Sequence, residues 1–184
     1  MNTLNFKGQL VRLAVTDLET DTRLMIQWSK DSEFDRLLDT EPAYLRTHKQ
    51  DKEWLQDHLK EMCTFMIHTL ADDRTIGFID LSGFNWAAGD ASVGIGLGER
   101  VYWGQGYGTD AMRIILRYAF EELNLRRVSL TVFEYNPRGI RSYEKAGFKI
   151  EGRARQAVNR AGQRWDIIFM GILRSEWEAA QVVS

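Results

Sequence analysis

Three glycines at alternate positions lead directly into an amphipathic helix in residues 103–112. The apolar residues after Thr109 recur at helical spacing. A glycine-rich turn at the start of a helix leaves backbone N–H groups unpaired at the positive end of the helix dipole. Because glycine carries no Cβ atom, a phosphate group can approach these donors closely. The pattern predicts a site for a phosphate-bearing molecule. Its residues are Trp103, Gly104, Gln105, Gly106, Tyr107, Gly108 and Thr109.

Neither of the two common nucleotide-binding motifs matches this turn. A mononucleotide loop requires Gly-Lys followed by Ser or Thr, and the chain has no such tripeptide. A dinucleotide fingerprint requires a third glycine where Thr109 stands, and an acidic residue at the end of a second strand. Glu121 and Glu122 lie inside the expected helix instead. A tight turn without a ligand is the alternative interpretation.

The elements after this turn follow a regular order. Residues 127–133 alternate apolar and polar side chains, as a strand does. Asn136 and Pro137 suit the cap and the first position of a helix. That helix is expected to end at Gly147, a typical C-terminal stop, and a further strand begins at Phe148.

This combination resembles the GNAT superfamily of acyl-CoA-dependent N-acyltransferases. The family's cofactor pattern is Gln or Arg, two variable residues, Gly, one variable residue, and Gly or Ala. Residues 103–108 match it, except that Trp stands at the first position. The second family pattern, N-x(6)-Y-x-x-x-G-F, matches residues 136–148. The segments 102–106 and 159–166 look most like the RimJ/RimL-type branch, which acetylates protein N-termini and other amines.

The resemblance implies acetyl-CoA as the co-substrate, with its pantetheine arm along the strand of residues 93–97. Ile95, Gly96 and Leu97 would offer backbone groups to this arm, and the strand could also donate an N–H to the oxyanion. In the family, a bulge splays this strand from residues 128–133 and opens a slot for the acyl group. Glycines in a strand suit a bulge or a close backbone approach. Simple packing would also explain them.

Tyr143 is the candidate general acid, because the family places a tyrosine near the departing sulfur. A phenol with a pKa of about 10 and a thiol with a pKa of about 8.5 are close enough for proton exchange in a tuned site. Tyr143 also follows Ile140 at helical spacing, so it could instead face the core. Ser142 is a weaker alternative acid and a candidate cofactor contact. Asn136 is a cap first and a cofactor contact second.

The general base is left open. Many relatives carry a glutamate on the strand before the turn, whereas Ser92 stands about there in this chain. Four carboxylates are candidates: Asp80, Asp90, Glu134 and Glu151. A weakly basic acceptor could also arrive already neutral. Cys63 lies outside the motif region, which favours direct attack by the amine over a covalent enzyme intermediate.

The acceptor is expected under a roof that the family builds from residues 16–64. Within it, residues 31–41 carry five acidic side chains and one arginine among Phe34, Leu37 and Leu38. An acidic, partly apolar roof favours a cationic acceptor such as a peptide N-terminus, a polyamine or another small amine. A solvated acidic loop is the alternative. The three histidines are not at ligand spacing and there is one cysteine, so no metal site is expected.

The composition is that of a globular protein with one domain. Of the 184 residues, 44% are hydrophobic and 27% are charged, and the net charge is −2. Neither this charge nor any apolar run indicates a nucleic acid or a membrane as partner. However, residues 126–174 hold eleven basic against four acidic residues, which indicates a solvated face or a site for an anionic cofactor or partner. One cysteine and the lack of a secretory signal pattern favour a cytoplasmic location, and a homodimer stays open.

The expected fold is one acetyltransferase domain over residues 1–184, with the cofactor motifs in residues 90–174. Its class is α/β (α+β), with a GNAT-like mixed, strongly bent central sheet of six to seven strands and about four helices. The periodicity itself predicts the order β-α-α-β-β-β-α-β-α-β-β. Strands are expected at 9–15, 65–70, 75–81, 92–97, 127–133, 148–158 and 164–173. Capping boxes at Thr16 and Thr47 are expected to start the first two helices.

The sequence thus predicts an enzyme that moves an acetyl group from acetyl-CoA to a primary amine, by direct attack in a ternary complex. The acceptor is a protein N-terminus or a small amine, and a polyamine N-acetyltransferase is one alternative. A non-catalytic acyl-CoA-binding regulatory module is another, motivated by the missing strand carboxylate. A nucleic-acid binder, motivated by the basic C-terminal half, is the third.

Overall fold

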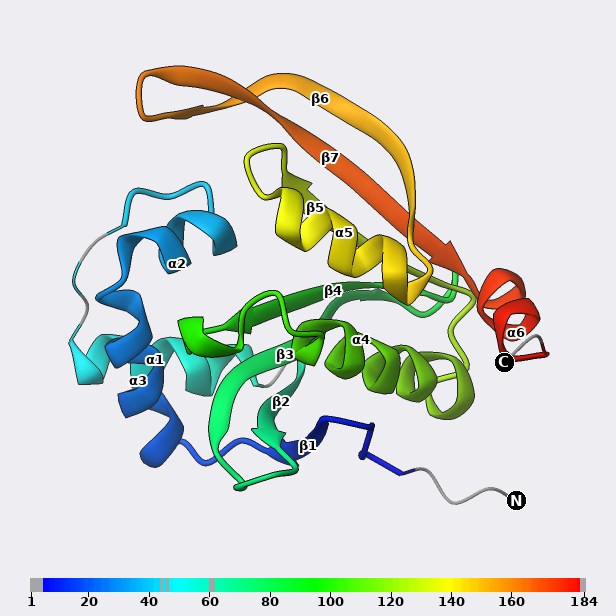
Figure 1. The fold of residues 1–184 in the computed structure, drawn as a ribbon, viewed down its shortest axis with the longest axis horizontal. Coiled ribbons are helices and arrows are strands. Elements are labelled where there is room, and N and C mark those ends of the chain that lie inside the picture. Colours follow the sequence, from blue (N-terminus) through cyan, green and yellow to red (C-terminus); the bar gives the residue numbers. More distant parts are fainter. Residues whose placement is uncertain (1–4, 44, 46, 60–61, 183–184) are drawn as a thin grey trace.

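One mixed sheet of seven strands organises the chain, and helices pack on both of its faces (Figure 1). The computed structural model describes residues 5–43, 45, 47–59 and 62–182. The strand order is β1-β2-β3-β4-β5-β7-β6. The strands are β1 Val11–Val15, β2 Cys63–Thr69, β3 Thr75–Asn85, β4 Asp90–Leu97, β5 Arg127–Phe133, β6 Lys149–Arg160 and β7 Gln163–Leu173. The helices are α1 Thr20–Ser29, α2 Ser32–Leu38, α3 His48–His58, α4 Tyr107–Arg117, α5 Pro137–Ala146 and α6 Arg174–Val182.

Strands β4 and β5 pair in parallel for only a short distance. Their partners run from Asp90 with Arg127 to Ser92 with Ser129, and the two strands separate beyond that point. The predicted splay is therefore confirmed. The predicted bulge at the β4 glycines is not seen, because the register of β3 and β4 is continuous from Ser92 to Leu97. The backbone groups of β4 beyond Ser92 thus face an opening in the sheet.

The two faces of the sheet carry separate hydrophobic clusters. The larger one joins the sheet residue Ile79 to α4, where Ile115 is fully buried. On the opposite face, Trp28 of α1, Phe34 of α2 and Met66 of β2 form a smaller cluster. Helix α2 is therefore anchored to the sheet by its own apolar side chain.

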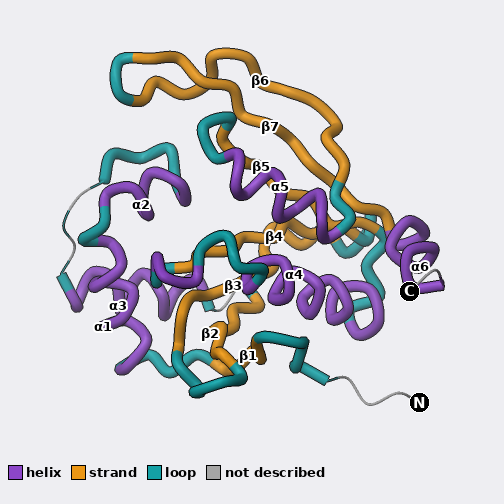
Figure 2. The backbone as a smooth tube through the Cα atoms, viewed as in Figure 1, coloured by secondary structure: helices purple, strands orange, loops and turns teal. Residues whose placement is uncertain are grey.

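Strands β6 and β7 form a long hairpin that arches over α5 towards the segment after α2 (Figure 2). Its turn residues Ala161 and Gly162 have φ values of 53° and 75°, the left-handed pair that tight hairpins favour. Near the tip, Arg160 Nη2 donates to the backbone carbonyls of residues 39–41 at 3.0, 3.1 and 3.2 Å. These bonds join the hairpin to the segment after α2.

The expected fold class is confirmed, and most predicted boundaries lie close to the observed ones. Strand β5 and helix α5 have the predicted limits, whereas β4 begins two residues earlier, at Asp90. Helices α2 and α6 have no counterpart in the predicted order, and the part of residues 31–41 from Ser32 to Leu38 is helical rather than a loop. Helix α2 begins there because the Asp31 side chain accepts the Glu33 N–H at 3.1 Å and Phe34 is buried.

One of the two predicted capping boxes is wrong. Helix α1 begins at Thr20, where Asp17 Oδ1 accepts the backbone N–H at 2.8 Å, and Thr16 lies outside the helix. An ionised carboxylate accepts more strongly than a hydroxyl, so Asp17 displaces Thr16 from this role. The box at Thr47 is confirmed, with reciprocal bonds between Thr47 and Gln50 at 3.4 and 3.0 Å.

Candidate active site

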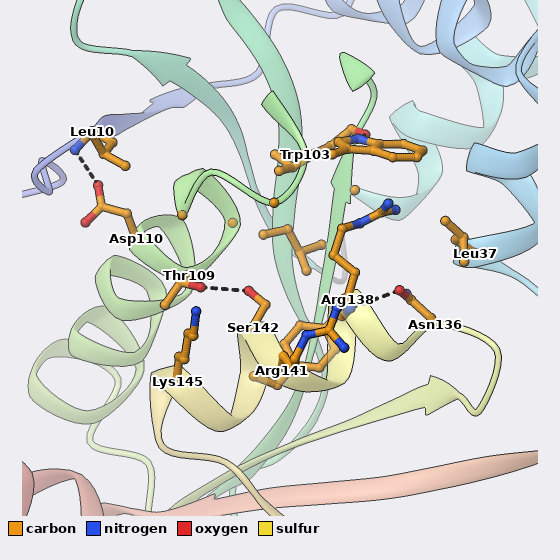
Figure 3. A pocket seen from close by; sticks show the side chains of 18 of the residues that line it. Leu10, Leu37, Trp103, Thr109, Asp110, Asn136, Arg138, Arg141, Ser142 and Lys145 are labelled. Atoms are coloured by element: carbon orange, nitrogen blue, oxygen red, sulfur yellow. Dashed lines mark hydrogen bonds between the residues drawn. The ribbon is translucent and has the colours of Figure 1, made fainter. Parts of the chain in front are cut away.

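A cavity of about 460 Å³ lies between β4, α2 and the first turns of α4 and α5 (Figure 3). Most of the predicted site residues line it. They are Ile95, Gly96, Leu97, Trp103, Gly104, Gly106, Gly108, Thr109, Asn136, Ser142 and Tyr143. Residues from two motifs about 30 positions apart in the sequence thus meet around one space.

Two predicted residues, Gln105 and Tyr107, are not among the residues that line the cavity. The Gln105 side chain donates to the carbonyl oxygen of Val101. The Tyr107 ring packs edge-on against Tyr102, with ring centroids 5.0 Å apart. Their side chains therefore contact the residues that precede the turn, and their predicted contacts with the cofactor stay predictions.

The glycine turn has the backbone geometry of an anion site. Gly104 and Gly106 have φ values of 75° and 94°, in the left-handed region that suits glycine. Gly106 is the N-cap of α4, and no side chain caps this helix. The first N–H groups of α4 are therefore available to a ligand at the positive end of the helix dipole.

A hydrogen bond joins α4 to α5 beside this turn. The hydroxyl oxygens of Thr109 and Ser142 are 2.9 Å apart, so one donates to the other. This bond fixes Ser142 near the start of α4, where a phosphate group is expected. Ser142 stays a predicted cofactor contact and an alternative acid.

Four cations that the sequence analysis does not assign to the site also line the cavity: Arg113, Arg138, Arg141 and Lys145. Three of them stand on α5 at positions 138, 141 and 145, a spacing that recurs on one helix face. Ser142 shares this face, so the helical spacing of these cations relative to Ser142 is the sequence signal that places them at the site. The four cations make the cavity a positively charged site that suits anionic groups of a ligand, such as the phosphates of an acyl-CoA.

Tyr143 lines the cavity, although its ring also packs on the main cluster. Among the residues that the structure describes, its hydroxyl has no hydrogen-bond partner. Burial raises the pKa of Tyr143 to about 12, and the nearby Arg138 opposes this shift. The phenol therefore keeps its proton at neutral pH and can donate it to a ligand.

The four candidate bases are absent from the described lining of the cavity. Glu134 is 3.2 Å from Arg153, and Glu151 is ion-paired with Arg127. Asp90 is at the opposite end of β4 from the glycine turn. The buried Asp80 faces Gly94, where an added Cβ would lie 2.9 Å from a carboxylate oxygen. The base is thus not identified by position.

Helix α2 closes one end of the cavity with Phe34, Leu37 and Leu38. The acidic residues at its start are not free to attract a cationic acceptor. Arg100 lies 2.7 Å from Glu33 and donates to Asp31 at 2.7 Å. The acidic charge of the predicted roof is therefore partly neutralised within the protein.

The β4 glycines permit close packing against this roof. A Cβ atom at Gly96 would lie 2.9 Å from the Phe78 ring and 3.1 Å from Leu38. Both distances are shorter than an ordinary van der Waals contact, so packing alone favours glycine at this position. The simple-packing interpretation of Gly96 is thus supported, and the residue still borders the cavity.

Asp110 is a lining residue that the sequence analysis does not assign to the site. Its carboxylate accepts the backbone N–H groups of Gln9, Leu10 and Val11 at 3.1, 2.7 and 3.0 Å. These bonds connect α4 to the start of β1, about 100 residues away in the sequence. Gln9 and Leu10 thereby become part of the cavity wall.

Asp110→Asn should destabilise the protein by about 2–3 kcal/mol, because an amide NH₂ would face backbone donors that the buried carboxylate now satisfies. Chemical denaturation would measure this as a lower midpoint with an unchanged m value. Asp73→Asn is a matched control, since exposed Asp73 pairs with Arg12 at the surface and should change stability by less than about 1 kcal/mol. Equal stabilities of the two variants would contradict the anchoring role.

Two further findings concern metal ions and membrane-spanning helices. In the described part of the chain, no three His, Cys, Asp or Glu side chains are grouped so that they could hold a metal ion. None of the described helices is long and apolar enough to span a membrane.

Comparison with known proteins gives a consistent result. A sequence model for a family described as "Acetyltransferase (GNAT) domain" matches residues 12–149. The "SPbeta prophage-derived uncharacterized N-acetyltransferase YokL" of Bacillus subtilis is 29% identical over 72% of this chain and 75% of its own length. The "Putative ribosomal N-acetyltransferase YdaF" of the same organism is 32% identical over 59% of each chain. The chain therefore spans about six tenths of the second relative.

Among solved structures, spermidine N-acetyltransferase from Vibrio cholerae in complex with CoA and spermine superposes with a TM-score of 0.81. The match covers 91% of this chain and 98% of that one, at 23% sequence identity. An acetyltransferase from Bacillus anthracis has a TM-score of 0.78 at 19% identity. These similarities show that the fold is shared.

Proposed function

The chain belongs to the GNAT acetyltransferase family, and from this premise we propose that it transfers an acetyl group from acetyl-CoA to a primary amine. The observation that carries the proposal is one cavity that is lined by the glycine turn of α4, by β4 where it separates from β5, and by Tyr143. The turn and its cations suit phosphate groups, and the opening suits a thioester. We further propose a RimJ/RimL-type enzyme, acting in the cytoplasm as one domain of residues 1–184.

In the proposed reaction, the neutral amine attacks the thioester carbonyl, so that a C–N bond forms and the C–S bond breaks. The Gly104–Gly108 turn and its cations hold the phosphates, while the free edge of β4 orients the thioester arm. A β4 N–H can stabilise the charge that develops on the carbonyl oxygen. Tyr143 donates to the departing sulfur, and the proton released by nitrogen restores its hydroxyl.

The raised pKa of Tyr143 defines how this donation works. A phenol with a pKa of about 12 is a weaker acid than a thiol with a pKa of about 8.5, so transfer of its proton to the free thiolate would be uphill by about 5 kcal/mol. We therefore assign Tyr143 a hydrogen bond that strengthens as charge develops on sulfur. Its proton moves fully only as the nitrogen releases its own.

The proposed acceptor is a peptide N-terminus, a polyamine or another small amine. The name of the relative YdaF supports the first, and the spermidine N-acetyltransferase of similar fold supports the second. The internal pairing of Arg100 with the acidic residues of α2 weighs against a polycation. A non-catalytic acyl-CoA-binding module is the rival function, because no candidate carboxylate is found in the described cavity lining.

Titration calorimetry with acetyl-CoA, with NAD and ATP as controls, tests the cofactor assignment. Selective micromolar binding of acetyl-CoA is expected, followed by release of CoA when a panel of amines is added. Binding without CoA release for any amine would favour the non-catalytic module. A preference for NAD or ATP would overturn the proposal as a whole.

The value of kcat/KM should rise with pH as the acceptor amine loses its proton. It should not decrease again at any pH up to about 10. With a pKa raised to about 12, Tyr143 stays about 99% protonated at pH 10, so the donor is present throughout the range. Initial rates of CoA release measured from pH 6 to 10 check this. A falling limb between pH 8 and 9 would assign the proton donation to another group.

A further inference from the structure

Arg138 differs from the other cations that line the cavity, because its side chain is half-buried and theirs are exposed. The exposed ones are Arg113, Arg141 and Lys145. Figure 3 shows Arg138 rising from α5 to the indole of Trp103, towards Leu37 and away from Thr109. Arg138 therefore lies at the α2 end of the cavity, whereas the Thr109–Ser142 bond marks the phosphate end.

Trp103 holds the guanidinium in this position. Arg138 Cζ lies 3.9 Å from the centroid of the indole ring, a favourable cation–π distance. The ring is itself fixed, because Trp103 Nε1 donates to the carbonyl oxygen of Leu97 at 2.6 Å. A second guanidinium, that of Arg100, lies 5.0 Å from the same ring, but it is paired with the acidic residues of α2.

Arg138 lacks an anionic partner within the described residues. Glu33 acts on its charge from a distance, but Glu33 is ion-paired with Arg100 at 2.7 Å. Burial is the main cause that lowers the pKa of Arg138, and the neighbouring Arg100 and Arg141 lower it further. A half-buried cation in such surroundings is stabilised when an anion binds to it.

The phosphate groups of a bound acetyl-CoA would have other partners. The N–H groups of the glycine turn and the three exposed cations serve the phosphate end of the cavity. The α2 end is lined by Phe34, Leu37, Leu38 and Asn136, and Arg138 is the charged residue among the described side chains there. An anion at Arg138 would therefore arrive with the acceptor.

We propose that Arg138 binds a carboxylate carried by the acceptor, so that this enzyme prefers amines with a carboxylate close to the reacting nitrogen. The planar guanidinium suits a carboxylate through two parallel hydrogen bonds. The carboxylate can be the α-carboxylate of a free amino acid or the side chain of an acidic N-terminal residue. This inference rests on the proposed function and narrows its acceptor class.

The test uses acceptor pairs that differ only in the carboxylate, namely phenylalanine with phenethylamine and lysine with 1,5-diaminopentane. The wild type should favour the carboxylate-bearing member about 10- to 100-fold in kcat/KM, and Arg138→Gln should bring this ratio close to one. Arg138→Lys should restore part of the preference, because it keeps the charge but not the planar fork. Dipeptide amides that begin with Asp or Ala distinguish an acidic peptide from a free amino acid as the source of the carboxylate.

Arg141→Gln is the matched control, one turn further along α5. It should raise the KM for acetyl-CoA and leave the ratio between paired acceptors unchanged. A wild-type preference for the amines without a carboxylate would overturn the inference, as would a ratio that Arg138→Gln does not alter. If no amine of the panel is acetylated by the wild type, the proposed function itself fails.

A shortened donor separates this role from a contact with the cofactor phosphates. Acetyl-pantetheine carries the thioester arm without the nucleotide. If Arg138 serves the acceptor, Arg138→Gln should lower the acceptor ratio by the same factor with acetyl-pantetheine as with acetyl-CoA. A loss that occurs only with acetyl-CoA would assign Arg138 to a phosphate group and contradict the proposal.

Discussion

Tyr143→Phe should lower kcat by about 100- to 10,000-fold and leave the dissociation constant of acetyl-CoA nearly unchanged. The substitution removes one oxygen atom and keeps the ring, which packs edge-on against Phe148 with centroids 6.3 Å apart. The hydroxyl has no hydrogen-bond partner among the described residues, so its loss leaves no buried group unsatisfied. The expected effect is therefore confined to donation towards the departing sulfur.

Single-turnover rates and calorimetry together measure this separation of kcat from binding. Tyr118→Phe is a suitable control, because this part-buried tyrosine is not among the residues that line the cavity. Its hydroxyl oxygen lies 4.0 Å from Cys63 Sγ. The control should keep nearly all of the activity. If the Tyr143→Phe enzyme is as active as the control, Tyr143 only packs against its neighbours and takes no part in the reaction.

The elements from the glycine turn to α5 could be predicted from the sequence because their signals are local. The left-handed residues Gly106 and Gly147, and the cap that Asn136 forms with the N–H of Gly139 at 2.9 Å, depend on residues only a few positions apart. Helical periodicity then predicts which side of α4 is buried. Such patterns hold in the folded protein because left-handed backbone conformations favour glycine and helix starts favour capping side chains.

The surroundings of α2 and the link from α4 to β1 could not be predicted in the same way, because they depend on contacts between distant residues. Arg100 reaches Asp31 across 69 positions, and Asp110 reaches Leu10 across 100. The acidic residues at the start of α2 predict a cationic acceptor, but their pairing with Arg100 cannot be read from the sequence. Similarly, the stacking of Arg138 on Trp103 joins two motifs whose separate patterns give no reason to pair them.

The glycine turn carries the second large effect, because Gly106→Val should weaken acetyl-CoA binding by about 100-fold or more. A Cβ atom at this position would meet only Leu10 Cδ1 at 3.5 Å, an ordinary contact, so the protein itself leaves room for it. The new side chain would instead occupy the space in front of the first N–H groups of α4. Losing two charge-assisted hydrogen bonds to a phosphate accounts for the size of the effect.

Backbone strain has to be separated from this loss, since Gly106 has a φ of 94° and valine disfavours that region. Gly162→Val provides the matched control. Gly162 has a φ of 75° in the β6–β7 turn, with no atom within 4 Å of an added Cβ. Both variants should lose about 1–2 kcal/mol or more of stability, but Gly162→Val should bind acetyl-CoA as the wild type does in calorimetry. If both variants bind equally well, the phosphate groups do not lie at the start of α4, and the mechanism derived from that position is wrong.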